Sequence, residues 1–273
     1  MEKINIEKST LIEVLRSGRS KKEIAKQLNI SRPTLNNLIK QHKVVSEYKY
    51  DRLVSGSRVS CNVKFFDIID TEEKAYILGF FLADGWITSD GKNVGFAVQK
   101  QDIDILEKIQ TALNHKGDLR YYVNSTGSDM VELKIGSIYM VNALIALGVD
   151  SNKSFTASIP KNITTDLIPS ILRGLFDGDG SFYSNVPILT TNSKSIRNFI
   201  IDYCKAVYRS QPSDYTQQNK NGVFSYRLGF TSSLKPLLDA MYNQPMIVLD
   251  RKYTAYINHR NKQSTETEDK KPQ

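Results

Sequence analysis

The stretch Asp70-Thr-Glu-Glu-Lys-Ala-Tyr-Ile-Leu-Gly-Phe-Phe-Leu-Ala-Asp-Gly85 decides the fold, because the chain contains a second copy of it. The second copy is Ile168-Pro-Ser-Ile-Leu-Arg-Gly-Leu-Phe-Asp-Gly-Asp-Gly180. Each copy is an apolar run of helical length that ends in Asp-Gly. Each also carries two small residues four positions apart, which are Gly79 and Ala83 in one copy and Gly174 and Gly178 in the other. Small residues at this spacing share a helix face and let two backbones approach, so we expect the two helices to pack together.

Both helices carry signals for where they begin and end. Asp70 or Thr71 can cap the first helix, and Glu73 can complete a capping box. Gly85 and Gly180 suit the left-handed backbone position that often follows a helix. The acid before each glycine is therefore expected at a C-terminal helix end.

Asp84 and Asp179 are these two acids. A carboxylate at a C-terminal helix end opposes the helix dipole, and two neighbouring carboxylates repel each other, so the pair predicts a cation between them. One Asp-Gly alone would indicate ordinary turn chemistry, but the repetition in one context argues against that reading. An EF-hand loop from Asp177 would need Gly and Glu at its sixth and twelfth positions, where the chain has Phe182 and Ile188.

Length and charge narrow the class of protein. A chain of 273 residues can bury one sizeable core and carry a small extra module. Its net charge of +8 and pI near 9.2 indicate a polyanionic partner, either nucleic acid or a membrane surface. Residues 1–45 alone hold ten basic and four acidic side chains, a net +6.

Cysteine and histidine usage excludes two further classes. Cys61 and Cys204 are isolated, and the three histidines share no ligand spacing, so neither a disulfide framework nor a zinc site is expected. We expect no signal peptide, because the first residues lack the apolar core of one, and no apolar run reaches the length of a membrane span. We expect a soluble intracellular protein of the cytoplasm or nucleoid.

Residues 20–40 predict a helix, a turn at Asn29 and a second helix that is capped by Ser31. This stretch resembles a helix-turn-helix, with apolar residues where that motif keeps its core. The resemblance implies that side chains of the second helix reach the major groove or its phosphates, namely Arg32, Thr34, Asn36, Asn37 and Lys40. The alternative is a helical packing module without DNA contact. Residues 46–69 are interpreted as a basic linker, laid along DNA or simply solvated.

The remainder of the chain repeats the order helix, two strands, helix, two strands, helix. The first half, 70–160, predicts strands near 86–89, 93–100, 118–124 and 130–135, with helices at 102–113 and 138–147. The second half, 161–260, predicts strands near 181–184, 187–191, 213–218 and 223–230, with helices at 165–178, 194–208 and 233–242. We expect an α+β fold of two pseudo-symmetric αββαββα halves that form a saddle, beside an all-α module at 1–45. A last helix is expected at 249–258 and a disordered tail at 261–273.

Polar side chains alternate with apolar ones along the strands that follow each repeated helix. The polar set is Gln99, Arg120, Tyr122, Asn124, Glu132 and Lys134 in the first half and Tyr215, Gln217, Ser225 and Arg227 in the second. Such side chains on an open sheet face can hold phosphates and read base edges. The alternative is ordinary alternation between a core face and a solvated face.

The paired motifs resemble the signature of the LAGLIDADG homing endonucleases of the two-motif, single-chain type, over residues 70–260. The second copy is close to the family pattern, and the first has Leu82 where an acid often stands. The resemblance implies hydrolysis of both strands of a long asymmetric DNA site, with a role in intron or intein mobility. Because one chain supplies both acids, we expect a monomer. The resemblance also implies Mg2+ or Mn2+ at the ends of the motifs, held by Asp84, Asp179, Gly85 and Gly180.

The same resemblance implies roles for side chains around the metal. Lys134 matches the usual place of a catalytic lysine, and Gln99 matches a position that organises water. In the second half Gly229 falls where the lysine would repeat, so Arg227 is the substitute candidate, and Thr190 falls opposite Gln99.

Two alternatives use the same fold. One is a DNA-binding regulator that has lost cleavage, and the other is an RNA intron maturase. Retention of both acids argues against the regulator, because a pure binder gains nothing from two repelling carboxylates. It does not argue against the maturase.

Overall fold

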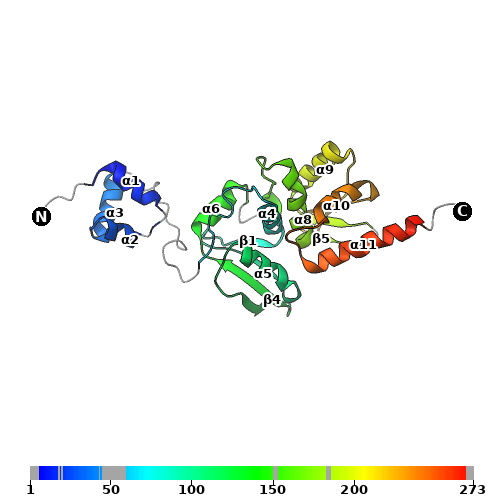
Figure 1. Cartoon of the computed structure of the whole chain (residues 1–273), viewed down its shortest axis with the longest axis horizontal. Coiled ribbons are helices and arrows are strands. Elements are labelled where there is room, and N and C mark those ends of the chain that lie inside the picture. The colour runs from blue at the N-terminus through cyan, green and yellow to red at the C-terminus, as the bar shows by residue number, and fades with distance from the viewer. Residues whose placement is uncertain are drawn as a thin grey trace.

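The computed structural model describes residues 6–17, 19, 21–42, 44, 60–149, 153–182 and 186–268. Buried side chains form two separate clusters, one within the first three helices and one within the rest of the described chain. Figure 1 shows these three helices as one group at the N-terminal end. None of the described helices has the length and apolar character that crossing a membrane requires.

The N-terminal module consists of α1 (Lys8–Arg16), α2 (Lys21–Gln27) and α3 (Arg32–Gln41). Asn29 has φ 52° in the turn before α3, a conformation that asparagine tolerates better than most residues. The Ser31 hydroxyl accepts a hydrogen bond from the Thr34 amide over 3.2 Å and caps α3. The predicted turn and cap are both present.

The body contains two copies of one topology. The first copy is α4 (Glu72–Asp84), β1 (Gly85–Ile87), β2 (Val94–Gln99), α5 (Ile103–Ala112), β3 (Arg120–Val123), β4 (Asp129–Ile135) and α6 (Ile138–Ala146). The second copy, which follows the short helix α7 (Lys153–Thr156), is α8 (Ile168–Asp179), β5 (Gly180–Ser181), β6 (Ile188–Thr191), α9 (Lys194–Tyr208), β7 (Ser213–Gln218), β8 (Phe224–Gly229) and α10 (Lys235–Tyr242). The antiparallel sheets have the equivalent orders β1-β2-β4-β3 and β5-β6-β8-β7. The predicted α+β fold with two αββαββα halves is confirmed.

Helices α4 and α8 pack backbone to backbone. A β-carbon added at Gly79 would overlap the carbonyl oxygen of Ile171, and one added at Gly174 would overlap the carbonyl oxygen of Tyr76. Figure 1 shows the two helices side by side at the centre of the body. The small residues therefore serve the close approach that the sequence predicted, and this helix pair is called the seam below.

The helix ends differ from the prediction in two details. Gly85 and Gly180 are extended, with φ −76° and −91°, so the predicted left-handed conformation is wrong. Glycine is required there because a β-carbon would overlap Phe81 or Phe176 of the preceding helix turn. The Thr71 hydroxyl caps α4 by accepting a hydrogen bond from the amide of Lys74. Lys74 therefore stands at the third helical position, where the predicted capping box required Glu73.

A buried polar network joins α8 to its neighbours. Asp177 is fully buried, and its carboxylate accepts hydrogen bonds from the hydroxyls of Tyr76 and Tyr242, each over 2.7 Å, and from the Leu249 amide over 2.8 Å. Burial raises the pKa of Asp177 to about 6, although these hydrogen bonds favour the charged form. Asp177 occupies the position of Leu82 in the first copy and is structural, which leaves Asp179 as the exposed acid of its motif.

Arg173 extends this network. Its side chain is buried, and it donates to the carbonyl oxygens of Met241 and Ile247 and to the carboxylate of Glu72 over 2.7 Å. One guanidinium therefore ties α8 to the start of α4 and to the segment after α10.

The last helix, α11 (Asp250–Glu268), binds to the first half of the body. Arg251 pairs with Asp102 over 2.5 Å, and Lys108 pairs with Asp250 over 2.5 Å. The sequence predicted a helix over 249–258 and a disordered tail from 261, but the helix continues to Glu268. The rest of that tail lies outside the described residues.

The predicted linker 46–69 is wrong over its last part. Residues 60–69 pack on the body, with Phe66 fully buried and the Asn62 amide donating to the Leu113 carbonyl over 2.7 Å. Apolar side chains in this stretch therefore extend the core. Residues 46–59 lie outside the described residues.

Candidate active site and nucleic-acid interface

Asp84 and Asp179 lie at the same end of the seam. Each is the last residue of its helix and leads directly into a strand. A β-carbon added at Gly178 would overlap that of Ala83 and stand 3.0 Å from Oδ2 of Asp84. The Asp84 carboxylate therefore lies against the residue next to Asp179, and glycine leaves the space for it. Asp84 is half-buried, whereas Asp179 is exposed.

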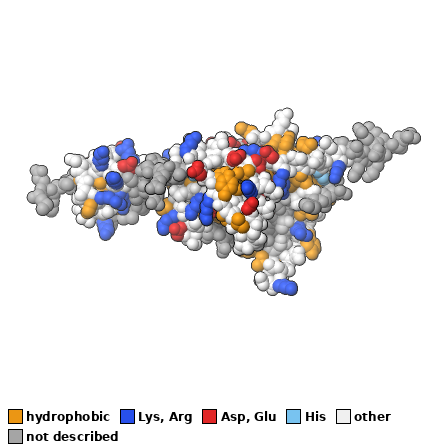
Figure 2. Space-filling view, turned by 90° about the horizontal axis from the view of Figure 1, so that it is seen from below, with side chains coloured by type: hydrophobic (Ala, Val, Ile, Leu, Met, Phe, Trp, Pro, Cys, Tyr) orange, Lys and Arg blue, Asp and Glu red, His pale blue; other side chains and the backbone are white. Residues whose placement is uncertain are grey.

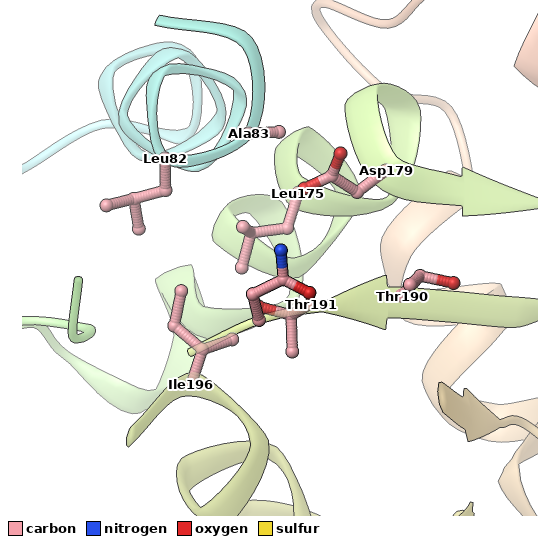
Figure 3. A pocket seen from close by; sticks show the side chains of 8 residues that line it. Leu82, Ala83, Leu175, Asp179, Thr190, Thr191 and Ile196 are labelled. Carbon is pink, nitrogen blue, oxygen red and sulfur yellow. The ribbon is translucent and has the colours of Figure 1, made fainter. Parts of the chain in front are cut away.

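A cavity of about 190 Å3 opens beside Asp179. Figure 3 shows Asp179 at the end of α8, with Ala83 on the facing side of α4 and Thr190 on the neighbouring strand. Its lining is Leu82, Ala83, Leu175, Asp179, Thr190, Thr191, Asn192 and Ile196. The polar end of this cavity consists of Asp179 and side chains from the end of β6.

Two basic residues from α11 lie at this end of the seam, and neither was predicted from the sequence. Lys252 is 6% exposed, and its ammonium group donates to the carbonyl oxygen of Gly180. Burial lowers the pKa of Lys252, and the charge of Arg251 lowers it further, while carboxylates that include Asp84 act in the opposite direction. The ion pair with Asp102 raises the pKa of Arg251, and the negative charge of Asp84 also raises it.

The predicted metal ligands, two carboxylates and two glycines, differ in their contacts. The Gly180 carbonyl accepts from Lys252, whose positive charge opposes a cation there, and its role as a ligand stays a prediction. Gly85 remains a prediction. Among the described residues no group of three or more His, Cys, Asp or Glu side chains could hold a metal ion, so the candidate site depends on two carboxylates.

Lys134 and Gln99 lie on the open face of the first sheet, which is the face opposite its buried side chains. Along the strands, one of them lies before the position of Gly85 and the other lies after it. Gly85 pairs with Phe96, whose side chain is buried on the opposite face. Lys134 pairs with Gly95, one position before Phe96, and Gln99 lies three positions after Phe96. Both side chains are exposed, as their predicted roles require.

The register of the second sheet shows what replaces Lys134. Gly180 pairs with Leu189, and the next pair towards the turn is Ile188 with Gly229. Gly229 is therefore the equivalent of Lys134, as the sequence predicted.

The register corrects the other equivalence. Thr190 pairs with Arg227, one position beyond Leu189, so Thr190 is not the equivalent of Gln99. That equivalent is Asn192, which lines the cavity beside Asp179. Arg227 is exposed on the open face but corresponds to Glu132, not to the catalytic lysine.

Asn124 shapes a turn, and its predicted DNA contact stays a prediction. Its side-chain oxygen accepts from the amides of Thr126 over 3.0 Å and Ser128 over 2.9 Å, and so it shapes the turn between β3 and β4. Asn219 does the same in the second half, where it accepts from the amides of Asn221 and Val223. These asparagines stabilise equivalent turns.

The other predicted sheet residues share the open faces. Arg120 pairs with Glu132 over 3.3 Å and lies over the ring of Tyr122, 5.4 Å from its centroid. Tyr215 and Gln217 are exposed in the second half. The remaining candidate, Ser225, is the half-buried register partner of Gln217.

The predicted contacts of the N-terminal module divide into two groups. Arg32, Asn37 and Lys40 are exposed on α3. Thr34 bonds with Ser31 through the two hydroxyls, and Asn36 accepts from Lys21 over 2.9 Å. Figure 2 shows Lys and Arg side chains on the surface of this module.

No family model matches the chain. A DNA polymerase of Acanthamoeba polyphaga mimivirus is 32% identical over 140 residues, covering 47% of this chain and 8% of that protein. The RNA polymerase subunit Rpo1C of Methanocaldococcus jannaschii is 26% identical over 151 residues, covering 52% of this chain and 16% of that protein. The chain thus spans less than a fifth of the length of these curated relatives.

Solved structures similar to the chain include I-DmoI in complex with DNA and Ca, with 12% identity, a TM-score of 0.46, and coverage of 72% of this chain and 100% of that one. The I-LtrWI LAGLIDADG homing endonuclease bound to target DNA is 15% identical, with a TM-score of 0.43 and coverage of 73% and 89%. The fold itself is established by the duplicated topology of this chain. The chain thus has the two-sheet α+β fold that its paired motifs predicted, and LAGLIDADG homing endonucleases are among the solved structures that resemble it.

Proposed function

We propose that the chain is a site-specific DNA endonuclease that uses a divalent cation to hydrolyse both strands of a long asymmetric site. The placement of Asp84 against Gly178, next to Asp179, supports this proposal. Two carboxylates at adjoining C-terminal helix ends repel each other and oppose both helix dipoles. A cation at this point offsets that cost.

The donors present fit a hard divalent ion. Carboxylate oxygens are ligands that Mg2+ and Mn2+ take, together with water and phosphate oxygens. Asp84 and Asp179 would hold the ion. When bound, it would stabilise charge on a scissile phosphate and favour ionisation of water.

The remaining roles belong to side chains of the open faces. Lys134 is exposed near the level of Gly85 and would bind a phosphate oxygen as that oxygen gains charge. Gln99 would orient the attacking water through its amide. In the second half Asn192 takes the position equivalent to Gln99, and Arg227 would bind the DNA backbone.

DNA contacts would extend over both sheets and the N-terminal module. The residues that would contact DNA from the sheets are Arg120, Tyr122, Asn124, Tyr215, Gln217 and Ser225. Helix α3 would contact it as part of a helix-turn-helix. Since one chain supplies both carboxylates, the active species would be a monomer. The proposed setting is intracellular, in the cytoplasm or nucleoid, with a role in intron or intein mobility.

The decisive experiment selects cleaved sites from a randomised duplex library with Mg2+. The wild-type chain is expected to enrich one long asymmetric site, and the double variant Asp84→Asn/Asp179→Asn to enrich none. Wild-type binding without cleavage would instead indicate a regulator. Tighter binding of structured intron RNA than of any duplex would indicate a maturase.

A further inference from the structure

The two halves differ in the basic group that faces their motif acid. Lys134 projects from the first sheet, but its equivalent in the second sheet is Gly229. Arg227 lies two residues before Gly229, at the place of Glu132. The second sheet therefore has no ammonium or guanidinium group at the position where the first sheet has Lys134.

Lys252 brings an ammonium group to this end of the second half from outside the repeated unit. It lies in the first turn of α11, which follows the second αββαββα copy. Its side chain is almost completely buried and donates to the carbonyl oxygen of Gly180, the residue directly after Asp179. Asp84 is among the carboxylates whose charge acts on it. Lys252 thus contacts the end of the second motif, and the charge at the end of the first motif also acts on it.

The ammonium group of Lys252 lies between a backbone carbonyl, an aromatic ring and a cavity. An ammonium has three donors, and among the described residues only the Gly180 carbonyl accepts from Lys252. The ring of Phe176 lies 5.9 Å from Nζ. Lys252 also lines a cavity of about 540 Å3 together with Gly180, Ser181, Phe182, Arg251 and Ala255. The charges of Asp177, Asp102 and Asp84 act on this ammonium group, and the cavity beside it has the volume to admit a DNA phosphate as a further anionic neighbour.

We propose that Lys252 is the second-half counterpart of Lys134 and acts as a positioning residue, which holds the Gly180 backbone and thereby fixes Asp179. This inference rests on the proposed endonuclease function. The two half-sites would then take their ammonium groups from different elements, β4 and α11. Each lysine would serve the cleavage of a different DNA strand.

The test measures nicking of each strand separately, on the duplex that the library selection recovers. Lys134→Met is expected to slow cleavage of one strand, and Lys252→Met to slow cleavage of the other by about 100-fold. Lys262→Met removes the same charge from an exposed position of α11 and is expected to leave both rates unchanged. If Lys252→Met slows both strands alike, or the same strand as Lys134→Met, the proposal is overturned.

A second measurement does not depend on cleavage. Mn2+ binding to the full-length chain without DNA is followed by electron paramagnetic resonance. Lys252→Met frees the Gly180 carbonyl and removes a repelling charge, so it is expected to bind Mn2+ more tightly than the wild type and Lys262→Met do. An unchanged Mn2+ affinity would contradict the role of Lys252.

The two proposals fail in distinguishable ways. If the wild type cleaves no library member, the endonuclease function fails, and the Mn2+ titration alone decides the role of Lys252. Thermal unfolding checks that each variant is folded. Should Lys252→Met not fold, Lys252→Arg keeps the charge but changes the geometry at Gly180, and it is expected to slow the same single strand.

Discussion

The hydroxyl of Tyr76 on α4 donates a 2.7 Å hydrogen bond to Asp177 on α8, across the seam between the two halves. Tyr242 and the Leu249 amide donate to the same carboxylate, and none of these groups faces solvent. Asp177→Ala leaves three buried donors without their acceptor. We expect it to lower the free energy of unfolding by about 3 kcal/mol or more, measured by urea denaturation. Asp166→Ala, at an exposed position before α8, is the control and should change it little. An equal loss in both variants would contradict the structural role.

The same carboxyl makes stability depend on pH. Burial raises the pKa of Asp177 from 3.8 to about 6 in the folded chain. Between these values the folded state binds the proton that the unfolded state has released, so stability falls as pH rises through this window and is level above it. The loss amounts to about 3 kcal/mol at most. Asp177→Asn cannot titrate, so urea denaturation from pH 4 to pH 7 should show this loss in the wild type relative to the variant. Parallel pH profiles would argue against the raised pKa.

The close approach of the seam can be tested at Gly174. A β-carbon there would overlap the Tyr76 carbonyl, and backbone cannot move aside as a side chain tip can. We expect Gly174→Ala to destabilise the chain by about 3 kcal/mol or to prevent folding. At Gly136 an added β-carbon meets only the Asn93 side chain at 3.4 Å, so Gly136→Ala should fold normally. Thermal unfolding distinguishes the two, and equal melting temperatures would refute the packing argument.

Asp84→Asn or Asp179→Asn is expected to abolish cleavage while DNA binding without metal survives or strengthens. Each substitution removes a carboxylate ligand and also a negative charge near phosphate. Nicking assays with Mg2+ and binding measured in EDTA separate the two effects. Cleavage at the wild-type rate by either variant would rule out the two-carboxylate site.

Deletion of residues 1–45 is expected to shorten the DNA footprint on one flank only. The module carries a net +6, so its loss should weaken binding and flatten the salt dependence, with each lost phosphate contact lowering the log-log slope by about 0.9. The seam is unchanged, and the shortened chain should still cleave the central site at low salt. A footprint of unchanged length would assign the module to packing or to a protein partner.

The order of helices and hairpins could be predicted from the sequence, because the spacing of apolar residues and the turn residues are properties of short stretches of chain. The turns at Gly91 and Gly222 have the positive φ values, 64° and 78°, that the Asp-Gly and Asn-Gly pairs favour. The backbone of Gly85 was not predictable in this way. Extended and left-handed glycines have the same sequence signal after a helix, and only the position of Phe81 decides between them.

Two properties of the candidate site depend on contacts that the sequence pattern does not contain. From Gly85 to its partner Phe96 the chain takes eleven steps, but from Gly180 to Leu189 only nine, so equivalent positions cannot be found by counting from the motifs, and the prediction of Thr190 as the equivalent of Gln99 was wrong. Lys252 follows its hydrogen-bond partner by 72 positions and belongs to no repeat. Neither a motif nor a periodicity marks such a residue.

The ion pairs of α11 distinguish the two halves of the duplicated body. Arg251 reaches Asp102, the residue that opens α5 in the first half, whereas the residue that opens α9 in the second half is Ser193, whose hydroxyl is held by the Ala157 carbonyl. Two copies of the second half would therefore bring Arg251 to a neutral position. The two halves are therefore complementary at this contact and not interchangeable, because an assembly of two second halves would lack the pair between Arg251 and Asp102.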